Sequence, residues 1–426
     1  MCGLNVRLIA LLKALIVEVS LDRELRLRYV TKGSAFSRQR KLTFERVVLL
    51  IISLCKKTLQ VELEHFFALF RAAPATVSAF VQQRKKIRSV FFRDLHEALA
   101  AAFYEWAGKR VRRWRGYKLI ACDGSSLPLI DQPDLRRHFG GQSNQHKDFI
   151  LARAFYHYDV LNALVVHARI APYRRGELQM AYEGLCHTHP DQILIYDRRF
   201  CVYDLLQRLT TQEWEQKFLI RATRQTGLVK DFIEKGARDA VVGYLPQSKQ
   251  CGTLPIAVRL VRVALPNGTV EVLMTNLWKE EGFTAADIAS LYALRWRVET
   301  RIGFDKNVLQ LCCFSGHSVQ VVEQDFYAAI LTGNLYALVS REAILPPGSQ
   351  RRHIPKVNNN TGFARFKTNF QRLFVLRDIQ ALLLELTRYF STHLLPIRPG
   401  RHFPRRRKNA MLKIKFKTQP NFKPAF

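Results

Sequence analysis

Apolar residues recur at helical spacing through about the first 110 residues of the chain. The stretches with this period are 8–19, 44–55, 61–70, 77–87 and 90–106. Because residues three and four apart share one face of a helix, each stretch predicts a helix with one buried face. Pro74 and Thr76 supply a break and a cap between two of these helices. The pattern therefore predicts an all-helical N-terminal domain over residues 1–112.

Two interpretations of residues 58–88 carry equal weight. The segment fits two helices around a short turn, with a basic end at Arg84, Lys85, Lys86 and Arg88, which suits docking on DNA. It fits equally well a helical bundle whose basic residues form a solvated rim. We expect the N-terminal domain to bind DNA, and the sequence leaves open which helix reads the bases.

From residue 117 onward the period changes to that of strands. Short apolar segments occur at 118–123, 151–157, 163–170, 192–197 and 217–221, and helical patterns occur at 177–186 and 202–209. A turn at 159–162 joins the second and third of these segments. Strand, hairpin, helix, strand, helix and strand in this order predict an α/β fold, with a mixed sheet flanked by helices. This domain is expected to cover residues 113–318.

A β-rich insertion is predicted inside that domain, at about residues 224–278. It contains a hairpin whose strands, 256–263 and 270–275, flank the turn Leu265-Pro266-Asn267-Gly268. One continuous helix is predicted over 285–309, with Thr284 as its N-cap.

The remaining sequence predicts C-terminal helices followed by a basic tail. Helical patterns over 319–344 and 371–389 fall in a region, 319–395, whose apolar faces are candidates for a dimer interface and equally for core. The tail, 396–426, is rich in Lys and Arg and is expected to bind phosphate electrostatically.

The charge of the chain favours a polyanionic partner. The 426 residues carry a formal net charge of +32. Nucleic acid is the first candidate, because the basic residues are spread along the chain and do not form one amphipathic membrane-binding segment. The apolar runs are too short or too interrupted to span a bilayer. The eight cysteines form no CxxC pair, which fits a reducing cytoplasm and no zinc site.

Four side chains of the helix predicted at 285–309 share one stripe. Tyr292, Arg295, Glu299 and Lys306 fall within an arc of roughly 60° at about 100° per residue. A carboxylate flanked by cations suits a metal ion acting on a nucleic-acid backbone. Taken alone, the stripe is more often a solvated charged face with ordinary ion pairs.

Two aspartates strengthen the catalytic interpretation. Asp123 and Asp197 each end a predicted apolar strand, and acids at strand ends gather at one edge of a sheet. Each aspartate alone is about as often a cap for the following turn. Together with Glu299 they form an all-carboxylate set, which suits Mg²⁺ or Mn²⁺ and two-metal phosphodiester chemistry.

These residues resemble the motifs of the DDE transposases of bacterial insertion sequences, specifically the insertion sequence 4 family. The resemblance rests on Ile120-Ala121-Cys122-Asp123-Gly124-Ser125, Ile195-Tyr196-Asp197-Arg198-Arg199-Phe200 and the Tyr-Arg-Glu-Lys signature Tyr292-x2-Arg295-x3-Glu299-x6-Lys306. Supporting similarity runs through Phe314-Ser315-Gly316-His317-Ser318 and Gln324-Asp325-Phe326-Tyr327. The family usually has Gly or Asn where this chain has Arg199. Three interpretations of Arg199 are open. It is harmless, it adds a contact to phosphate, or it marks a copy of the element that has lost activity.

The resemblance implies a ribonuclease-H-like fold and cut-and-paste DNA transposition. Asp123, Asp197 and Glu299 would hold two divalent ions, and the chain would cut transposon-end DNA and join it to target DNA, as a homodimer in the synaptic complex. The DNA contacts it implies are Tyr292, Arg295, Lys306 and Arg198, with Trp278 ahead of Trp296 as the platform for a flipped base. The expected location is the cytoplasm, at the nucleoid, with no membrane partner.

Two other functions stay open at this point. One is a catalytically inactive DNA-binding relative, such as a transposition repressor or a domesticated copy. The other is a structure-selective nuclease with the same fold, which cleaves strands without joining them.

Overall fold

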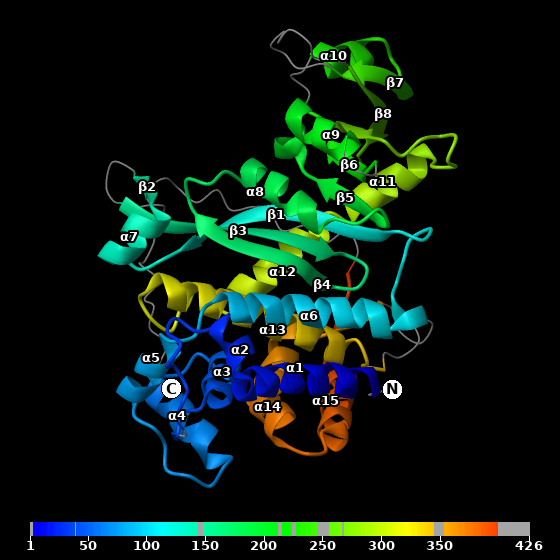
Figure 1. Ribbon diagram of the computed structural model, residues 1–426. Coiled ribbons are helices and arrows are strands. Elements are labelled where there is room, and N and C mark those ends of the chain that lie inside the picture. Colours follow the sequence, from blue (N-terminus) through cyan, green and yellow to red (C-terminus); the bar gives the residue numbers. More distant parts are fainter. Residues whose placement is uncertain are drawn as a thin grey trace, which may run out of the picture. The chain divides into compact units, whose positions relative to one another are not determined.

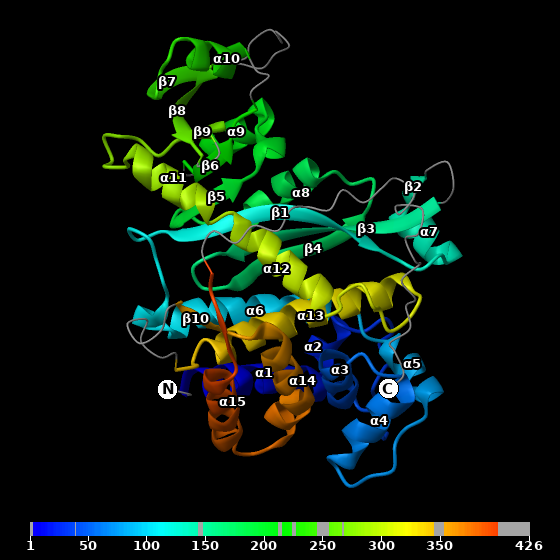
Figure 2. The ribbon, with the colours of Figure 1, turned by 180° about the vertical axis from the view of Figure 1, so that it is seen from behind.

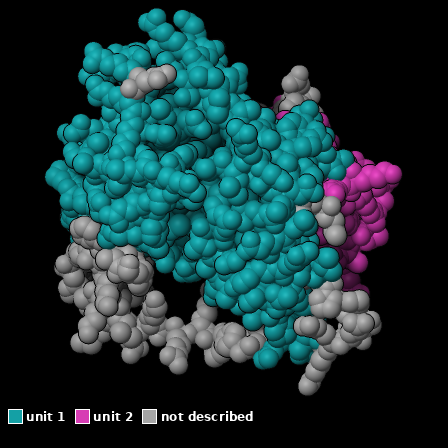
Figure 3. All heavy atoms as spheres, turned by 90° about the horizontal axis from the view of Figure 1, so that it is seen from below, with its two compact units in different colours: residues 1–108, 127–152, 303–426 teal, residues 109–126, 153–302 magenta. Residues whose placement is uncertain are grey.

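The computed structural model describes residues 3–38, 40–143, 148–211, 215–223, 227–244, 255–265, 268–344 and 353–398. The chain forms two compact units, shown in Figure 3. Unit 1 contains residues 1–108, 127–152 and 303–426, and unit 2 contains residues 109–126 and 153–302. The domain boundaries expected from the sequence, at 112, 318 and 395, stay predictions. Almost all of the basic tail lies outside the described residues.

Unit 2 is built on a mixed sheet. Its strands are β1 (Lys118–Pro128), β3 (Asp148–Asp159), β4 (Leu164–Pro172), β5 (Gln192–Tyr196), β6 (Lys217–Arg221), β7 (Asp239–Tyr244), β8 (Ile256–Ala264) and β9 (Val270–Thr275). They are ordered β3-β1-β5-β6-β9-β8-β7, with β4 paired to β3. β5 runs parallel to β1 and β6, and β9 runs antiparallel to β6. The order β4-β3-β1-β5-β6 is that of a ribonuclease-H-like sheet, so the predicted fold class is confirmed.

The β-rich insertion extends this sheet beyond β6. The predicted hairpin is present as β8 and β9, with Ala264 opposite Val270 and Arg259 opposite Thr275. Gly268, at the end of the connecting turn, has φ +76, a conformation that glycine adopts without steric cost. The insertion also contributes the helix α10 (Gly227–Glu234).

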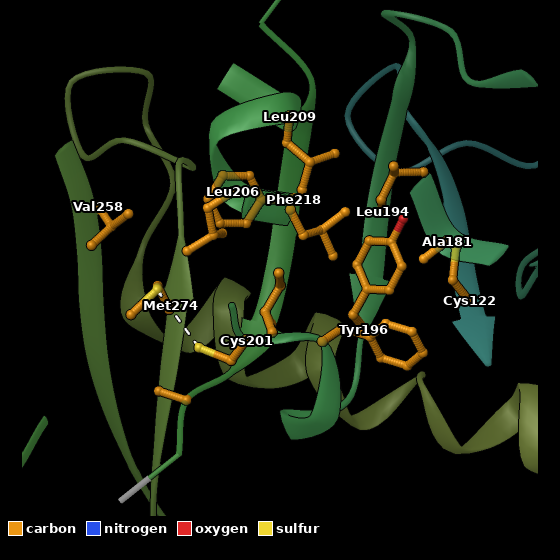
Figure 4. Packing of buried hydrophobic residues seen from close by; sticks show 14 of the residues in the cluster. Cys122, Ala181, Leu194, Tyr196, Cys201, Leu206, Leu209, Phe218, Val258 and Met274 are labelled. Atoms are coloured by element: carbon orange, nitrogen blue, oxygen red, sulfur yellow. Dashed lines mark hydrogen bonds between the residues drawn. The ribbon is translucent and has the colours of Figure 1, made fainter. Parts of the chain in front are cut away.

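Helices cover the sheet of unit 2 and close its core. The helices α8 (Glu177–Gly184) and α9 (Tyr203–Thr210) contribute to one cluster of buried apolar side chains, drawn in part in Figure 4. There Leu206 and Leu209 of α9 point toward Phe218 of β6. Because successive side chains of a strand point to opposite faces, the other buried residues of the strands face away from this cluster. The helix α11 (Ala285–Ala293), which contacts β6 and β8, buries its own apolar residues outside the cluster.

Three imidazole rings lie in a row inside unit 2. His167 of β4 stacks on His187 of the short helix η2 (Leu185–His187), with centroids 3.8 Å apart, and lies 5.5 Å from His157 of β3. Gly184 leaves room for His157, since a Cβ there would come within 2.6 Å of His157 Nε2. Burial, followed by the two neighbouring imidazoles, holds the pKa of His157 well below its usual range. His157 is therefore neutral in the folded chain.

Acid is expected to destabilise unit 2 through His157. Since the pKa of His157 is lower in the folded chain than the unfolded value of about 6.5, its contribution to stability is complete above that pH and falls by up to about 1.4 kcal/mol per pH unit below it. Urea unfolding at pH 7.5, 6.0 and 5.0 measures this loss. His157→Leu should flatten the pH dependence, whereas the same change at the exposed His189 should leave it as in the native chain. Equal pH dependence in all three proteins would contradict the expectation.

Unit 1 is mainly helical. Its helices are α1 (Gly3–Leu21), α2 (Arg23–Leu27), α3 (Phe44–Ser53), α4 (Leu59–Ala68), α5 (Val77–Arg84), α6 (Val90–Trp106), α7 (Pro133–Phe139), α13 (Val319–Ser340), α14 (Asn359–Val375) and α15 (Gln380–Thr392). α13 contacts α3, α6, α14 and α15, and it runs alongside α6 in both views of the ribbon (Figures 1 and 2). Short strands pair as β2 (Gly141–Ser143) with the start of β3, and as β10 (Pro355–Val357) with β11 (Leu394–Pro396). The N-terminal helices therefore share one core with the C-terminal helices.

Two helix predictions in unit 1 were wrong in detail. The single helix expected at 371–389 is two helices, because the backbone at Leu376 is extended (ψ 145) and Asp378 Oδ1 accepts a hydrogen bond from Gln380 N at the start of α15. The turn expected inside 58–88 is a connection over residues 69–76, longer than that of a helix-turn-helix. None of the helices in the described ranges is long and apolar enough to cross a bilayer.

Arg84 is buried, although the sequence placed it in a basic end of α5. Its Nη2 donates to Asp325 Oδ1 at 2.7 Å and its Nε donates to Gln324 Oε1 at 2.6 Å. Asp325 Oδ2 also accepts from Ser315 N and Ser315 Oγ, at 2.5 and 2.7 Å. The side chains of Arg84 and Asp325 are only 2% and 3% exposed. The Phe-Ser-Gly-His-Ser and Gln-Asp-Phe-Tyr motifs therefore supply a buried polar network around one arginine of α5.

Candidate active site

Asp123 and Asp197 lie side by side just beyond the paired part of two adjacent parallel strands. The sequence predicted that Asp123 ends its strand, but β1 continues to Pro128, so Asp123 lies inside β1, whereas Asp197 directly follows β5. The last pair of the β1–β5 register is Ala121 opposite Ile195, and each aspartate lies two residues further along its strand. Neighbouring strands are about 5 Å apart, so the two carboxylates start from neighbouring backbone positions. The strand pairing thus places the two aspartates next to each other, and their joint role with Glu299 stays a prediction. Each carboxylate also accepts a local backbone hydrogen bond. Asp123 Oδ1 accepts from Gly124 N at 2.8 Å within β1, and Asp197 Oδ1 accepts from Arg199 N at 2.7 Å as the N-cap of a short 3-10 helix.

Asp123 is the carboxylate most affected by its surroundings. Burial is the main cause that raises its pKa to about 7, and the charges of Asp197 and Glu299 raise it further. The backbone N–H of Gly124 and the guanidinium of Arg295 act in the opposite direction. Asp123 is therefore close enough to both Asp197 and Glu299 for their negative charges to act on it through a partly buried space.

Glu299 lies on a shorter helix than the sequence predicted. The helix expected to be continuous over 285–309 is broken at residues 294–295, into α11 and α12 (Trp296–Asn307). The break is a tightened turn, because Arg295 N donates to Tyr292 O and Val298 N donates to Arg295 O, three residues apart instead of four. Tyr292 therefore belongs to α11, and Glu299 and Lys306 belong to α12. The common stripe calculated for one ideal helix therefore holds only within each of the two helices. The predicted N-cap is present: Thr284 and Asp287 form a capping box at the start of α11.

The carboxylates fit a divalent cation in chemistry, although their side chains do not yet converge on one point. Within the described ranges, no three His, Cys, Asp or Glu side chains lie close enough together to hold an ion. Glu299 Oε1 instead accepts from Arg295 Nη2 at 2.9 Å, and 36% of the Glu299 side chain is exposed. Burial is the main cause of the raised pKa of Asp123, and the charges of Asp197 and Glu299 add to it, so a bound cation would favour the charged form of Asp123. Oxygen ligands alone suit Mg²⁺ or Mn²⁺.

Tyr292 and Arg295 line the inner side of this region. Burial raises the pKa of Tyr292 to about 12, and its hydroxyl has no hydrogen-bond partner among the described residues. The Arg295 guanidinium lies 5.8 Å from the ring centroid of Tyr292 and 5.1 Å from that of Trp296. Trp296, the second candidate for a base platform, is 53% exposed. Trp278, ranked ahead of it, is half-buried.

A cavity of about 540 Å³ adjoins Asp197 in unit 2. It is lined by the side of β9 and the end of β6, and its charged residues are Asp197, Arg198, Arg199, Arg221 and Glu271. Arg221 Nη1 pairs with Glu271 Oε1 at 2.8 Å. Sequence reasoning missed these last two residues. The sequence did contain a signal for Arg221. Arg221 is the last residue of β6, which runs parallel to β5, and Asp197 directly follows β5, so both residues lie near the same ends of neighbouring strands.

Lys306 lies on the same helix as Glu299 but belongs to the other compact unit. It lies on α12 seven residues after Glu299, which is two turns of a regular helix. Residues from 303 onward belong to unit 1, and there burial lowers the pKa of Lys306. The structure thus brings together Asp123, Asp197, Glu299, Arg295 and Tyr292 within unit 2, and it leaves the predicted role of Lys306 as a prediction.

Comparisons with known proteins agree with this geometry. A family model described as "Transposase DDE domain" matches residues 114–335, just over half of the chain. The chain is 26% identical over 137 residues to the Escherichia coli (strain K12) protein named "Putative transposase InsZ". That match covers 32% of this chain and 45% of that protein.

One solved structure shows a weaker likeness. It is titled "Cryo-EM structure of piggyBac transposase synaptic complex with hairpin DNA (SNHP)", with 11% identity, a TM-score of 0.45 and coverage of 92% of this chain and 87% of that one. A likeness at this level does not bear on the activity of the chain. The family model includes both aspartates, Glu299 and the strands that carry the aspartates, and the chain therefore belongs to the family of proteins with a transposase DDE domain.

Proposed function

We propose that this chain is a transposase of the insertion sequence 4 family that moves an insertion sequence by cut-and-paste transposition. The observation that carries the proposal is the in-register pair of Asp123 and Asp197, each two residues beyond the last pair of β1 and β5, with Glu299 close enough to raise the pKa of Asp123. Three carboxylates in this arrangement, inside a region matched by the transposase DDE domain, suit metal-dependent phosphodiester chemistry.

The reaction has two phosphoryl-transfer steps. In the first, the oxygen of water loses a proton and bonds to the phosphorus at the element end, the bond from phosphorus to the 3′ oxygen breaks, and the departing 3′ oxygen takes up a proton to become the 3′-hydroxyl. In the second, the freed 3′-hydroxyl oxygen bonds to a phosphorus of target DNA and displaces a target 3′ oxygen. Two Mg²⁺ or Mn²⁺ ions, when bound, would supply charge stabilisation and activation of the attacking oxygen. Asp123, Asp197 and Glu299 would hold these ions.

The remaining residues of the site would position the DNA. The Tyr292 hydroxyl, buried without a hydrogen-bond partner among the described residues, can donate to a phosphate oxygen. Arg295 would turn from Glu299 toward DNA when the carboxylates hold cations, and Arg198 lines the cavity beside Asp197. Trp278 and the exposed Trp296 are the candidates for stacking on an extruded base. The partners would be transposon-end DNA, target DNA and a second copy of the chain, at the nucleoid in the cytoplasm.

The test is a cleavage assay on DNA that carries the element's own ends, with Mg²⁺ or Mn²⁺. We expect the native chain to nick the ends and to join them to a target duplex, and Glu299→Ala to do neither while it still binds the ends. Binding without cleavage by both proteins would favour the inactive DNA-binding relative. Cleavage without strand joining would favour the nuclease.

Lys306→Ala is expected to weaken binding to the element ends and to lower the salt dependence of that binding by about one unit of slope, if Lys306 contacts a phosphate. Fluorescence anisotropy of labelled DNA, measured at salt concentrations from about 50 to about 200 mM, gives both the affinity and its salt dependence. The matched control is Lys230→Ala, which removes the same charge from the exposed side of α10. An unchanged slope for Lys306→Ala would remove this residue from the DNA interface.

A further inference from the structure

Arg199, the position at which the sequence departs from the family, is held at both its backbone and its side chain. Its backbone N–H donates to Asp197 Oδ1 at 2.7 Å, and its Nη1 donates to Glu177 Oε2 at 2.9 Å. Arg199 thus connects the segment of the second aspartate to the start of helix α8. The Arg199 side chain is 69% exposed, so the ion pair by itself adds little to folding stability.

Glu177 continues this connection toward the first aspartate. Its Oε1 accepts from Arg153 Nη1 at 2.8 Å, and the same nitrogen donates to Ser126 Oγ of β1 at 3.1 Å. Glu177 is the first residue of α8, where the helix dipole favours a carboxylate, and only 10% of its side chain is exposed. Arg153, Glu177 and Arg199 therefore form a continuous bridge from β1 to the segment that carries Asp197.

Gly124 allows Glu177 to approach the backbone of the first aspartate. A Cβ at Gly124 would lie 2.4 Å from Glu177 Cγ and 2.9 Å from Glu177 Oε1, so any side chain there would displace Glu177. Gly124 directly follows Asp123. At one end of the bridge, Glu177 therefore packs against the backbone of Gly124, next to Asp123. At the other end, Arg199 binds Asp197 through its backbone N–H.

We propose that Arg199 is a positioning residue that, through Glu177, sets the separation of Asp123 and Asp197 and thereby tunes their affinity for a divalent cation. This inference rests on the proposed function. The two aspartates repel one another, and the bridge resists their separation while making no contact with the cation. Partners that orient metal ligands in this way commonly change metal affinity or activity by 10–100-fold. The arginine at position 199 then supports the site and does not mark a decayed copy.

The test measures Mn²⁺ binding to the full chain without DNA, from the electron paramagnetic resonance signal of free Mn²⁺. We expect Arg199→Gln and Glu177→Gln each to weaken Mn²⁺ binding about tenfold. The double variant should show little further loss, because both changes break one bridge. Arg199→Lys should restore part of the affinity. The matched control is Arg175→Gln, which removes the same charge and breaks a pair with Glu183 of the same helix at 3.4 Å, and it should bind Mn²⁺ like the native chain.

A second measurement separates this role from a phosphate contact. If Arg199 binds DNA directly, Arg199→Gln will lower DNA affinity and flatten its salt dependence while Mn²⁺ affinity stays native, and the proposal is overturned. Native Mn²⁺ affinity in Glu177→Gln overturns it as well.

The proposed function fails in a different way. Its metal site requires that the native chain bind Mn²⁺ and that Asp123→Asn bind it more weakly. Failure of that comparison removes the metal site itself, whereas failure of the Arg199 comparison alone removes only the bridge. Melting temperatures of all variants are compared with that of Arg175→Gln, so that a general loss of folding is recognised.

Discussion

Asp123→Asn is expected to slow cleavage of element-end DNA by roughly 10³-fold or more, as commonly follows when a group acting at the reacting atoms is removed. Asn has nearly the same shape as Asp, so the backbone of β1 and its pairing with β5 should stay intact. What is lost is one negative charge at the carboxylate whose pKa burial raises to about 7. Steady-state cleavage rates at saturating DNA, with anisotropy for the binding step, measure the two effects separately.

The control for this prediction lies at the start of β1, five residues before Asp123. Asp191 pairs with Lys118, the first residue of β1, and with Arg113, at 3.0 and 2.8 Å. Asp191→Asn removes the same charge from the same unit but far along the strand from the site, and it should cleave at close to the native rate. If both variants lose activity equally, the loss at Asp123 reflects general electrostatics or folding and not the site.

Arg84→Met is expected to lower the free energy of unfolding of unit 1 by about 3–5 kcal/mol, a large share of the 5–15 kcal/mol typical of folded proteins. The change leaves Asp325 buried with its charge no longer compensated, and a buried unpaired charge is costly. Ser315 still donates to Asp325, so some compensation remains. Urea unfolding at constant pH measures the loss.

Two further variants show whether the loss comes from the buried pair. Arg84→Met combined with Asp325→Leu removes both charges and should recover much of the stability, because an apolar pair of similar volume often replaces a buried ion pair at little cost. Arg365→Met breaks an exposed pair with Glu385 in the same unit and should cost less than about 1 kcal/mol. A small loss in Arg84→Met would mean that water reaches Asp325 readily.

The aspartates of the site could be predicted from the sequence because a local pattern determines their position. An apolar run followed directly by an acid occurs in both segments, and their parallel register, with Ala121 opposite Ile195, places the two acids in one row, although β1 itself continues past Asp123. The break in the helix that carries Glu299 could not be predicted, because the sequence there contains no proline. The break is a tightened turn at Arg295. The side chain of Arg295 pairs with Glu299 and lies beside the rings of Tyr292 and Trp296.

The buried arginine was missed for a related reason. Local sequence assigns Arg84 to a run of basic residues, and such runs usually lie at the surface. Its partners, Ser315, Gln324 and Asp325, are remote in sequence, so only the assembled helices show that it is internal.

The burial of Arg84 against α13 has a consequence during synthesis of the chain. Asp325 follows Arg84 by 241 residues, so a ribosome adding about 5–20 residues per second delivers it roughly 10–50 s later. Through that interval α5 and the neighbouring helices have left the ribosome without the helix that completes their core. We therefore expect nascent chains of this protein to depend on chaperones that cover exposed apolar helices, and production of intact protein to fall steeply when such chaperones are depleted.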